Sequence, residues 1–344
     1  MKENGFGIVG AGVIGTLHAE AIGLVPGARL AAVTDVVPES AKDLAGRYGC
    51  TAEPDLAALL ARPDVDVVSV CVPSGLHAEV AAMAAAAGKH LVIEKPIDVT
   101  LEAADRLIAA AGAAGVTMTV ISQHQFDAGL GELRRLLESG ALGTLLLGEA
   151  STKWYRTQGY YDSAQWRGTW AMDGGSLMNQ GVHYVDLLRW CMGPVAEVTA
   201  VCATQAHQVE VEDTALAIVR FASGALATIV SSTAVYPGFS QRLEITGTEG
   251  TVVVEDGRIV LRALRSGPPG PGGPAEQAAA AADAAAHAGG IDPASHAAQI
   301  ADLLGAIDRG RQPSVTAQSA RDTLEIVCAV YDSARSGRTV VLQA

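Results

Sequence analysis

Short apolar runs alternate with helix-forming segments over the first third of the chain. Runs that are nearly all apolar are typical of strands in a parallel sheet whose two faces are both covered by helices. We expect such strands at Phe6–Val9, Leu30–Thr34, Val65–Val72, His90–Glu94 and Thr117–Ser122. Apolar positions recur at helical spacing between them, over residues 13–24, 41–48, 56–62, 78–87 and 101–114. Because crossovers between parallel strands are right-handed, this alternation predicts a doubly wound α/β domain over residues 1–122.

The pattern changes after residue 122. Later runs alternate β-branched and polar residues and are separated by tight-turn sequences such as Ser223-Gly224 and Asp256-Gly257. Strands joined by tight turns form antiparallel sheets, so residues 123–344 are predicted to form an α+β domain. Its predicted strands are 198–204, 214–221, 225–232, 242–246, 251–255, 258–262 and 339–342, and its predicted helices include 130–139, 295–309 and 319–336. The low-complexity segment 266–290 is interpreted as a mobile excursion rather than a domain boundary.

The composition is that of a folded, acidic protein. Of 344 residues, 49% are hydrophobic and 18% are charged, and the length suits two domains. The net charge of −13 argues against a nucleic-acid or anionic-membrane surface, which needs an excess of lysine and arginine. The five cysteines are scattered without metal-ligand spacing, so no metal is expected. With no signal-peptide core and no apolar run of the roughly 18 residues that a membrane helix needs, we expect a soluble cytoplasmic protein.

A glycine-rich loop lies between the first predicted strand and the first predicted helix. It has the form GxGxxG and consists of Gly10, Ala11, Gly12, Val13, Ile14 and Gly15. The first glycine permits a tight turn, the second lets a diphosphate approach the backbone, and the third lets helix and strand pack closely. The N–H groups and dipole at the helix start then bind the phosphates. The loop and its flanking elements therefore predict a dinucleotide-binding Rossmann domain.

Asp35 ends the second predicted strand, 20 residues after Gly15. A carboxylate in this position binds the adenosine ribose hydroxyls and repels the 2′-phosphate of NADP. Residues 36–38 contain no arginine that would receive such a phosphate, so NAD is favoured over NADP. The alternative interpretation makes Asp35 a turn or helix-capping acid with a structural role only.

Two later clusters carry candidate catalytic groups. Glu94-Lys95-Pro96 follows a parallel strand at its carboxyl end, where ligands bind in open α/β sheets. Residues 174–186 form the second cluster, which is predicted to be helical from Ser176. Asn179 and His183 are four residues apart, so they share a helix face and can converge on one ligand. A buried histidine that only ties the helix to the sheet is the alternative.

In order and spacing, these motifs resemble those of the Gfo/Idh/MocA family, which includes glucose–fructose oxidoreductase and inositol dehydrogenase. The resemblance rests on the glycine loop, the turn 72–77, the Glu94-Lys95-Pro96 motif, the helix 174–186 and the closing segment 296–313. It covers essentially the whole chain. It implies a C-terminal domain built on a large open, mainly antiparallel sheet, which often pairs subunits into homodimers or homotetramers.

The resemblance also implies roles for individual residues. Lys95 would hydrogen-bond the reacting oxygen, and His183 would act as general acid/base. These roles suit the chemistry, because imidazole exchanges a proton near neutral pH and an ammonium group stabilises charge developing on oxygen. Further residues would line the cofactor: Val72, Pro73, Ser74, His77, Glu94, Gln123, Trp166 and Arg167.

Two positions depart from the family pattern. Asn179 stands where inositol dehydrogenase has an aspartate, and an amide orients a substrate without serving as an acid or base. In this it resembles the subgroup that acts at C3 of nucleotide-linked or otherwise modified sugars. Gln125 stands where relatives frequently have an arginine, which puts in doubt whatever that arginine holds.

The segment 153–162 concentrates aromatic residues in a chain with only 4% of them. Aromatic faces stack on sugar rings and arginine binds phosphate or carboxylate, so Tyr155 and Arg156 are predicted substrate contacts, together with His124. A surface loop sealed by its aromatic residues, or a subunit contact, is the alternative.

These features predict an NAD-dependent enzyme that moves a hydride between the nicotinamide and a hydroxyl or keto carbon. The expected substrate is a sugar, an inositol or a nucleotide-sugar-like molecule. One alternative is an NAD-dependent glycosidase that oxidises its sugar only transiently. Another is a non-catalytic NAD-binding regulator of the same fold, against which the intact Lys95 and His183 speak.

Overall fold

The computed structural model describes residues 3–266 and 292–342, and these form two compact units. The first consists of the described residues of Met1–Gln123 and Ile291–Asp322, and the second of those of His124–Gly290 and Thr323–Ala344. Apart from Ser266, the low-complexity segment 266–290 lies outside the described residues. Within the described ranges, no helix combines the length and the apolar character that crossing a membrane requires.

The first unit is built on a parallel sheet with the strand order β3-β2-β1-β4-β5-β6. Its strands are β1 (Asn4–Val9), β2 (Ala28–Thr34), β3 (Thr51–Ala52), β4 (Val67–Val70), β5 (His90–Ile93) and β6 (Met118–Val120). The order reverses between β1 and β4, and ligands bind at the carboxyl ends of strands at such a reversal. This topology confirms the predicted doubly wound domain.

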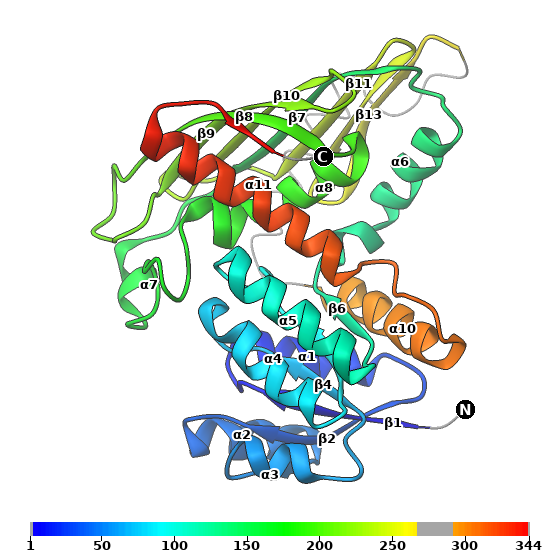
Figure 1. Cartoon of the computed structure of the whole chain (residues 1–344), viewed down its shortest axis with the longest axis vertical. Coiled ribbons are helices and arrows are strands. Elements are labelled where there is room, and N and C mark those ends of the chain that lie inside the picture. The colour runs from blue at the N-terminus through cyan, green and yellow to red at the C-terminus, as the bar shows by residue number, and fades with distance from the viewer. Residues whose placement is uncertain (1–2, 267–291, 343–344) are drawn as a thin grey trace. The chain divides into compact units, whose positions relative to one another are not determined.

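Helices connect the strands of this unit, and α4 and α5 pack side by side (Figure 1). They are α1 (Val13–Gly23), α2 (Pro38–Tyr48), α3 (Leu56–Ala61), α4 (His77–Ala86) and α5 (Leu101–Ala114), with a 3₁₀ turn at Ser74–Leu76. Local sequence sets their ends. The Asp55 and Thr100 side chains accept backbone N–H groups at the starts of α3 and α5. Gly49 and Gly115 end α2 and α5 in the left-handed conformation.

Helix α10 (Pro293–Arg309) belongs to the first unit although it lies late in the sequence. Its residues Ile300 and Leu303 are fully buried in the same apolar cluster as Ile22 of α1. Gln299 accepts a hydrogen bond from the Ser122 N–H and donates to the Val120 carbonyl, which ties the helix to the end of β6. The sequence-based division had placed this segment with residues 123–344.

The second unit is built on a sheet with the strand order β13-β12-β11-β7-β10-β9-β8-β14. Its strands are β7 (Leu145–Lys153), β8 (Val195–Ala203), β9 (Thr214–Phe221), β10 (Leu226–Ser232), β11 (Arg242–Gly247), β12 (Gly250–Glu255), β13 (Arg258–Leu264) and β14 (Val340–Val341). Strands β7 and β10 pair in parallel, and the other described pairs are antiparallel. The predicted mainly antiparallel sheet is therefore confirmed.

One face of this sheet carries α8 and the turn before it (Figure 1). The helical segments are a 3₁₀ turn at Gln123–Phe126, α6 (Ala128–Glu138), α7 (Gln158–Asp162), a π-type turn η3 (Ser176–Gly181), α8 (Val182–Met192) and α11 (Ala317–Ser336), the last shared by the two units. Strand β9 shows the two-sidedness of the sheet. Ala217 and Val219 are buried towards the helices, whereas Leu216 and Ile218 are exposed on the outer face.

Candidate functional site

The glycine loop of the first unit has no room for a side chain at two of its glycines and is open at the third. Gly10 has a φ of 101°, and a Cβ there would lie 2.4 Å from the Cys71 carbonyl oxygen. A Cβ on Gly15 would lie 2.0 Å from the Gly10 carbonyl oxygen. At Gly12, by contrast, a Cβ would meet nothing within 4 Å. Gly10 and Gly15 thus permit close packing, while Gly12 leaves its backbone accessible to a ligand.

The N-terminus of α1 is open to an anion. Gly12 caps this helix without a side-chain hydrogen bond, and its first turn contains no acidic residue. Val13, at the first helical position, is 79% exposed. The backbone N–H groups and the helix dipole therefore face solvent, an arrangement that favours a phosphate.

Asp35 follows β2 and ties the glycine loop to the end of that strand. Its Oδ2 accepts from the Ala11 N–H at 2.6 Å, and its Oδ1 accepts from the Val37 N–H at 2.8 Å. Each carboxylate oxygen can still accept a second bond, which suits a ribose hydroxyl. Asp35 thus has the structural role that the alternative interpretation gave it, and it keeps the capacity to bind a ribose.

Two loops at the carboxyl edge of the sheet are linked by His77. Its imidazole nitrogens lie 2.6 Å from the Pro96 carbonyl oxygen and 2.9 Å from the Val72 carbonyl oxygen. Burial lowers the pKa of His77, whereas its hydrogen bonds to these carbonyl groups favour the protonated ring. Neighbouring Ser74 is also buried. His77 therefore positions the turn 72–77 and the Glu94-Lys95-Pro96 segment beside each other.

Glu94 belongs to a buried cluster that the motif analysis missed. His18 Nε2 lies 2.8 Å from Glu94 Oε1, and His296 Nε2 lies 3.7 Å from the same oxygen. His18 Nδ1 also lies 2.5 Å from the Ser69 hydroxyl, and Glu94 Oε2 accepts from the Lys95 N–H. Among the described residues, His18, Glu94 and His296 bring ligand-type atoms within 4.8 Å of one another.

Charge and hydrogen bonding hold this cluster together. Burial opposes the charge of Glu94, but the bonds from His18 and His296 hold its pKa well below the usual range. Burial likewise opposes protonation of His18, yet Cys71 and Glu94 raise its pKa to about 10. The result is a buried ion pair that fixes the backbone next to Lys95.

Gln123 supplies a buried polar atom at the end of β6. Its Oε1 is buried and has no hydrogen-bond partner within the described part of the chain. Such an atom suits a ligand amide that donates a hydrogen bond. With the open helix start, the accessible Gly12 and the Asp35 carboxylate, the first unit fits a dinucleotide.

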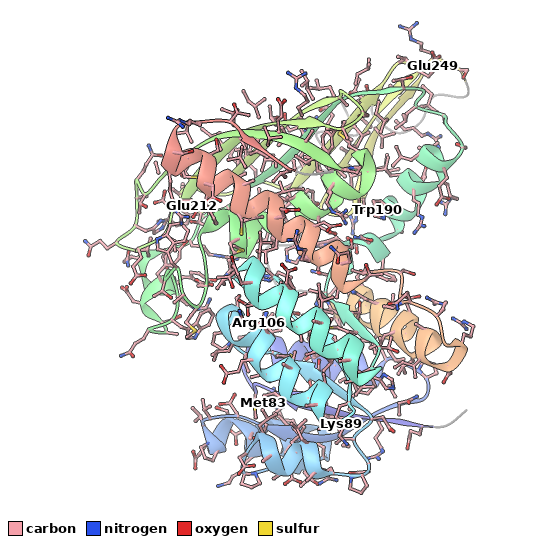
Figure 2. All side chains as sticks on the ribbon, viewed as in Figure 1. Met83, Lys89, Arg106, Trp190, Glu212 and Glu249 are labelled. Carbon is pink, nitrogen blue, oxygen red and sulfur yellow. The ribbon has the colours of Figure 1, made fainter. Side chains whose placement is uncertain are left out.

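The second unit holds the glycine pair and the segment that follows it. Gly174 has a φ of 74°, and a Cβ on Gly175 would lie 1.5 Å from Glu212 Oε2. Glu212 (labelled in Figure 2) accepts from the Leu177 N–H at 2.8 Å and from the Tyr331 hydroxyl at 3.1 Å. Burial raises the pKa of Glu212 to about 7. The glycine pair is thus required to seat this carboxyl group under the turn that carries Asn179.

The segment after the glycine pair differs from the predicted uniform helix. It begins as the π-type turn η3 and becomes an α-helix only at Val182. The simple four-residue spacing therefore does not by itself place Asn179 and His183 on one face. The side-chain amide of Asn179 donates to Asp173, whose other oxygen accepts from the Gly168 N–H at 2.8 Å.

His183 packs against a second histidine. Its ring centroid lies 5.2 Å from that of His124 in an edge-to-face arrangement. His124 Nδ1 lies 2.7 Å from Asp127 Oδ2, an interaction that holds this nitrogen in its protonated form. The structure thus brings the predicted residues His124 and His183 together, with Asp127 behind them.

Gln125, where the resemblance implies an arginine, hydrogen-bonds a buried carboxylate. Its Nε2 donates to Asp186 Oδ2 at 2.6 Å, and the Thr323 hydroxyl donates to Asp186 Oδ1 at 2.8 Å. Asp186 is buried. Gln125 thus hydrogen-bonds Asp186 through a neutral amide, whereas an arginine at position 125 would form an ion pair with it.

The aromatic segment forms a compact cluster around Tyr160. The Arg156 guanidinium lies over the rings of Trp154 and Tyr160, and that of Arg167 lies over Tyr160 and Trp166. Tyr155 points elsewhere, since it packs edge-to-face against Tyr236 and is 42% exposed. Sequence reasoning singled out Arg156 and Arg167 separately and missed that they share one aromatic ring.

Two family models match this chain. Residues 5–122 match the oxidoreductase family with an NAD-binding Rossmann fold, and residues 130–253 match the GFO/IDH/MocA C-terminal domain.

Known proteins are similar over most of the chain. Inositol 2-dehydrogenase of Rhizobium meliloti is 30% identical over 76% of this chain and 78% of its own length. An uncharacterized oxidoreductase of Bacillus subtilis is 30% identical over 73% of this chain and 74% of its own. The WlbA dehydrogenase from Bordetella pertussis, solved with NADH and UDP-GlcNAcA, has a TM-score of 0.89 and is 31% identical, covering 100% of this chain and 99% of its own.

Proposed function

The chain belongs to the Gfo/Idh/MocA family of NAD-dependent oxidoreductases, and from that premise we propose a substrate and residue roles. The substrate is a sugar, an inositol or a nucleotide sugar, oxidised at a hydroxyl-bearing carbon or reduced at a ketone. The relative named inositol 2-dehydrogenase and the dehydrogenase solved with UDP-GlcNAcA support this class. The observation that carries the proposal is the carboxyl edge of the parallel sheet, where the open glycine loop, Asp35 and the Glu94-Lys95 segment occur together.

NAD is the cofactor, and the first unit offers the groups to hold it. The backbone of Gly10 to Gly15 would bind the diphosphate, and Asp35 the adenosine ribose. Val36 is 99% exposed, and Val36, Val37 and Pro38 offer no cation for a 2′-phosphate. When bound, NAD supplies the carbon that accepts or gives the hydride. The residues proposed to line it are Val72, Pro73, Ser74, His77, Glu94, Gln123, Trp166 and Arg167.

We assign the proton chemistry to His183 and Lys95. Hydride leaves a carbon only as the proton leaves its hydroxyl, so His183 would accept that proton as general base. The Lys95 ammonium would stabilise negative charge developing on the same oxygen. Asn179 would orient the substrate, because its amide cannot exchange a proton.

The contact between Asp127 and His124 supports this assignment. By holding His124 in one tautomer, Asp127 fixes the ring against which His183 packs. A fixed neighbour limits the rotation of the general base, which keeps its nitrogen aimed at the hydroxyl.

The test is NADH formation with a panel of inositols, aldoses, uronic acids and nucleotide sugars. We expect absorbance of NADH to rise with one class, and Lys95→Ala to lower kcat by about a hundredfold or more while NAD still binds. Comparable turnover in that variant would refute the role of Lys95. A product released by bond cleavage without net NADH would instead favour the glycosidase alternative.

We further propose that the protein is a cytoplasmic homo-oligomer. All five cysteines are free thiols, as is usual in a reducing compartment. The outer face of the second unit's sheet exposes Val201, Leu216, Ile218 and Leu226, which supports pairing of subunits through that face.

A further inference from the structure

Two guanidinium groups share one aromatic ring in the second unit. Arg156 Cζ lies 5.1 Å from the centroid of the Tyr160 ring, and Arg167 Cζ lies 4.4 Å from it. Arg156 Cζ also lies 5.1 Å from the centroid of the Trp154 ring. Arg167 Cζ lies 4.5 Å from that of Trp166. The aromatic rings therefore hold two like charges around one tyrosine side chain.

Among the residues that the structure describes, no carboxylate forms an ion pair with either guanidinium. Arg167 Nη1 donates to the Tyr160 hydroxyl at 2.7 Å, while the Nε atoms of Arg156 and Arg167 are buried without an acceptor. Arg62 and Arg242 show the contrast, because each forms ion pairs with two carboxylates. A cation whose buried donor has no acceptor is unfavourable until an acceptor joins it, and an anion serves best.

The Tyr160 hydroxyl adds a third donor. It accepts from Arg167 Nη1 and from Gln180 Nε2, the latter at 3.3 Å, so its own proton is available to donate. Burial raises the pKa of Tyr160, which keeps the phenol protonated. Asp173, an acid whose charge acts on Tyr160, is already bonded to Gly168 and Asn179.

The cluster is linked to the proposed substrate-orienting residue. Gln180 Nε2, which donates to Tyr160, also donates to Asn179 Oδ1 at 3.1 Å. We propose that Arg156, Arg167 and Tyr160 form an oxyanion-binding subsite for a carboxylate or phosphate carried by the sugar substrate. This deepens, and rests on, the proposed sugar oxidoreductase function. Arg167 would then serve both ligands, because it is also proposed to line the cofactor, whose diphosphate offers the same chemistry.

The test measures binding to the whole chain by tryptophan fluorescence, because Trp154 and Trp166 lie against the two guanidinium groups. D-Glucuronate is the anionic probe, D-glucose its neutral counterpart, and inorganic phosphate the smallest oxyanion. We expect D-glucuronate to bind at least tenfold more tightly than D-glucose. Arg156→Gln should remove that preference and weaken phosphate binding at least tenfold.

Arg335→Gln is the matched control. Arg335 also lies over a tryptophan ring, that of Trp170 at 4.9 Å, but it forms an ion pair with Asp332. This variant should keep the preference for D-glucuronate. NAD is titrated in parallel to separate the two sources of an anion.

Equal affinity of the wild-type protein for D-glucuronate and D-glucose would overturn the proposal, whether or not Arg156→Gln folds. So would a variant that loses NAD affinity tenfold while keeping its affinity for D-glucuronate, since the arginines would then serve the cofactor. Silence of every sugar in the NADH assay, together with no consumption of NADH by keto sugars, would refute the proposed function, yet the binding contrast would still decide on the subsite.

Discussion

Glu212 is a carboxyl group whose surroundings oppose its charge. It is buried beneath the η3 turn, and its Oε1 accepts two hydrogen bonds while Oε2 has no partner among the described residues. Burial raises the pKa to about 7, against an ordinary value of 4.5. Between these two pH values the folded chain keeps a proton that the unfolded chain releases, so stability falls as pH rises.

Glu212→Gln should remove this pH dependence, because the amide imitates the protonated carboxyl group. The free energy of unfolding of the wild type, relative to the variant, should fall by up to about 1.4 kcal/mol per pH unit between pH 4.5 and 7. Above pH 7 the difference should become constant. Urea unfolding of both proteins from pH 4 to 8 measures it, and groups common to both cancel in the difference. Parallel stability curves would show that the pKa of Glu212 is the same in the folded and the unfolded chain.

Gly175 lies directly before the η3 turn, and the sequence motif did not explain why a glycine is needed there. A Cβ there would displace Glu212 from its bonds to the Leu177 N–H and the Tyr331 hydroxyl. Gly175→Ala should therefore destabilise the chain by about 1–3 kcal/mol in urea unfolding. Gly46→Ala is the control, since a Cβ within α2 at Gly46 meets nothing within 4 Å and should be neutral or stabilising by up to about 1 kcal/mol. Equal stability of the two variants would contradict the requirement for glycine.

The sequence predicted helix α10 but not the unit in which it packs. Its apolar spacing predicts a helix, but that spacing does not state which core it joins. Since Leu303 is fully buried in the cluster that contains Ile22, Leu303→Ala should lower the free energy of unfolding by about 2–5 kcal/mol. Hydrogen exchange should then accelerate in α1. Asp308→Ala, on the exposed side of the same helix, should change stability by less than about 0.5 kcal/mol. Unchanged hydrogen exchange in α1 would contradict the prediction, because the stability of α1 would then not depend on Leu303.

At the scale of the whole molecule, periodicity was sufficient for the architecture. Continuous apolar runs and alternating runs distinguish a parallel from an antiparallel sheet, and both sheets are confirmed. Periodicity does not predict contacts between residues that are far apart in the sequence. The burial of His18 against Glu94, the sharing of Tyr160 by Arg156 and Arg167, and the parallel pairing of β7 with β10 depend on tertiary packing rather than on spacing.

The outer face of the eight-stranded sheet is the surface that we propose to pair subunits. Val201 pairs with Leu216 across β8 and β9, and Leu226 pairs with Leu147 across β10 and β7, so exposed apolar side chains run over four strands. An apolar face of this kind is typical of an interface between subunits, and a two-fold axis would set the face against itself.

Ile218→Glu would place two opposed carboxylates in that interface. Ile218 is 62% exposed on β9, so the substitution leaves the buried side of the strand intact. We expect the wild type to be a dimer or tetramer by light scattering, and the variant to dissociate at least a hundredfold more readily, because burying like charges is costly. Met83→Glu on α4 (labelled in Figure 2) introduces the same charge at a residue that is 48% exposed in the first unit, and should leave the mass unchanged. A wild-type monomer at micromolar concentration, or equal masses for all three proteins, would mean that this face does not pair subunits.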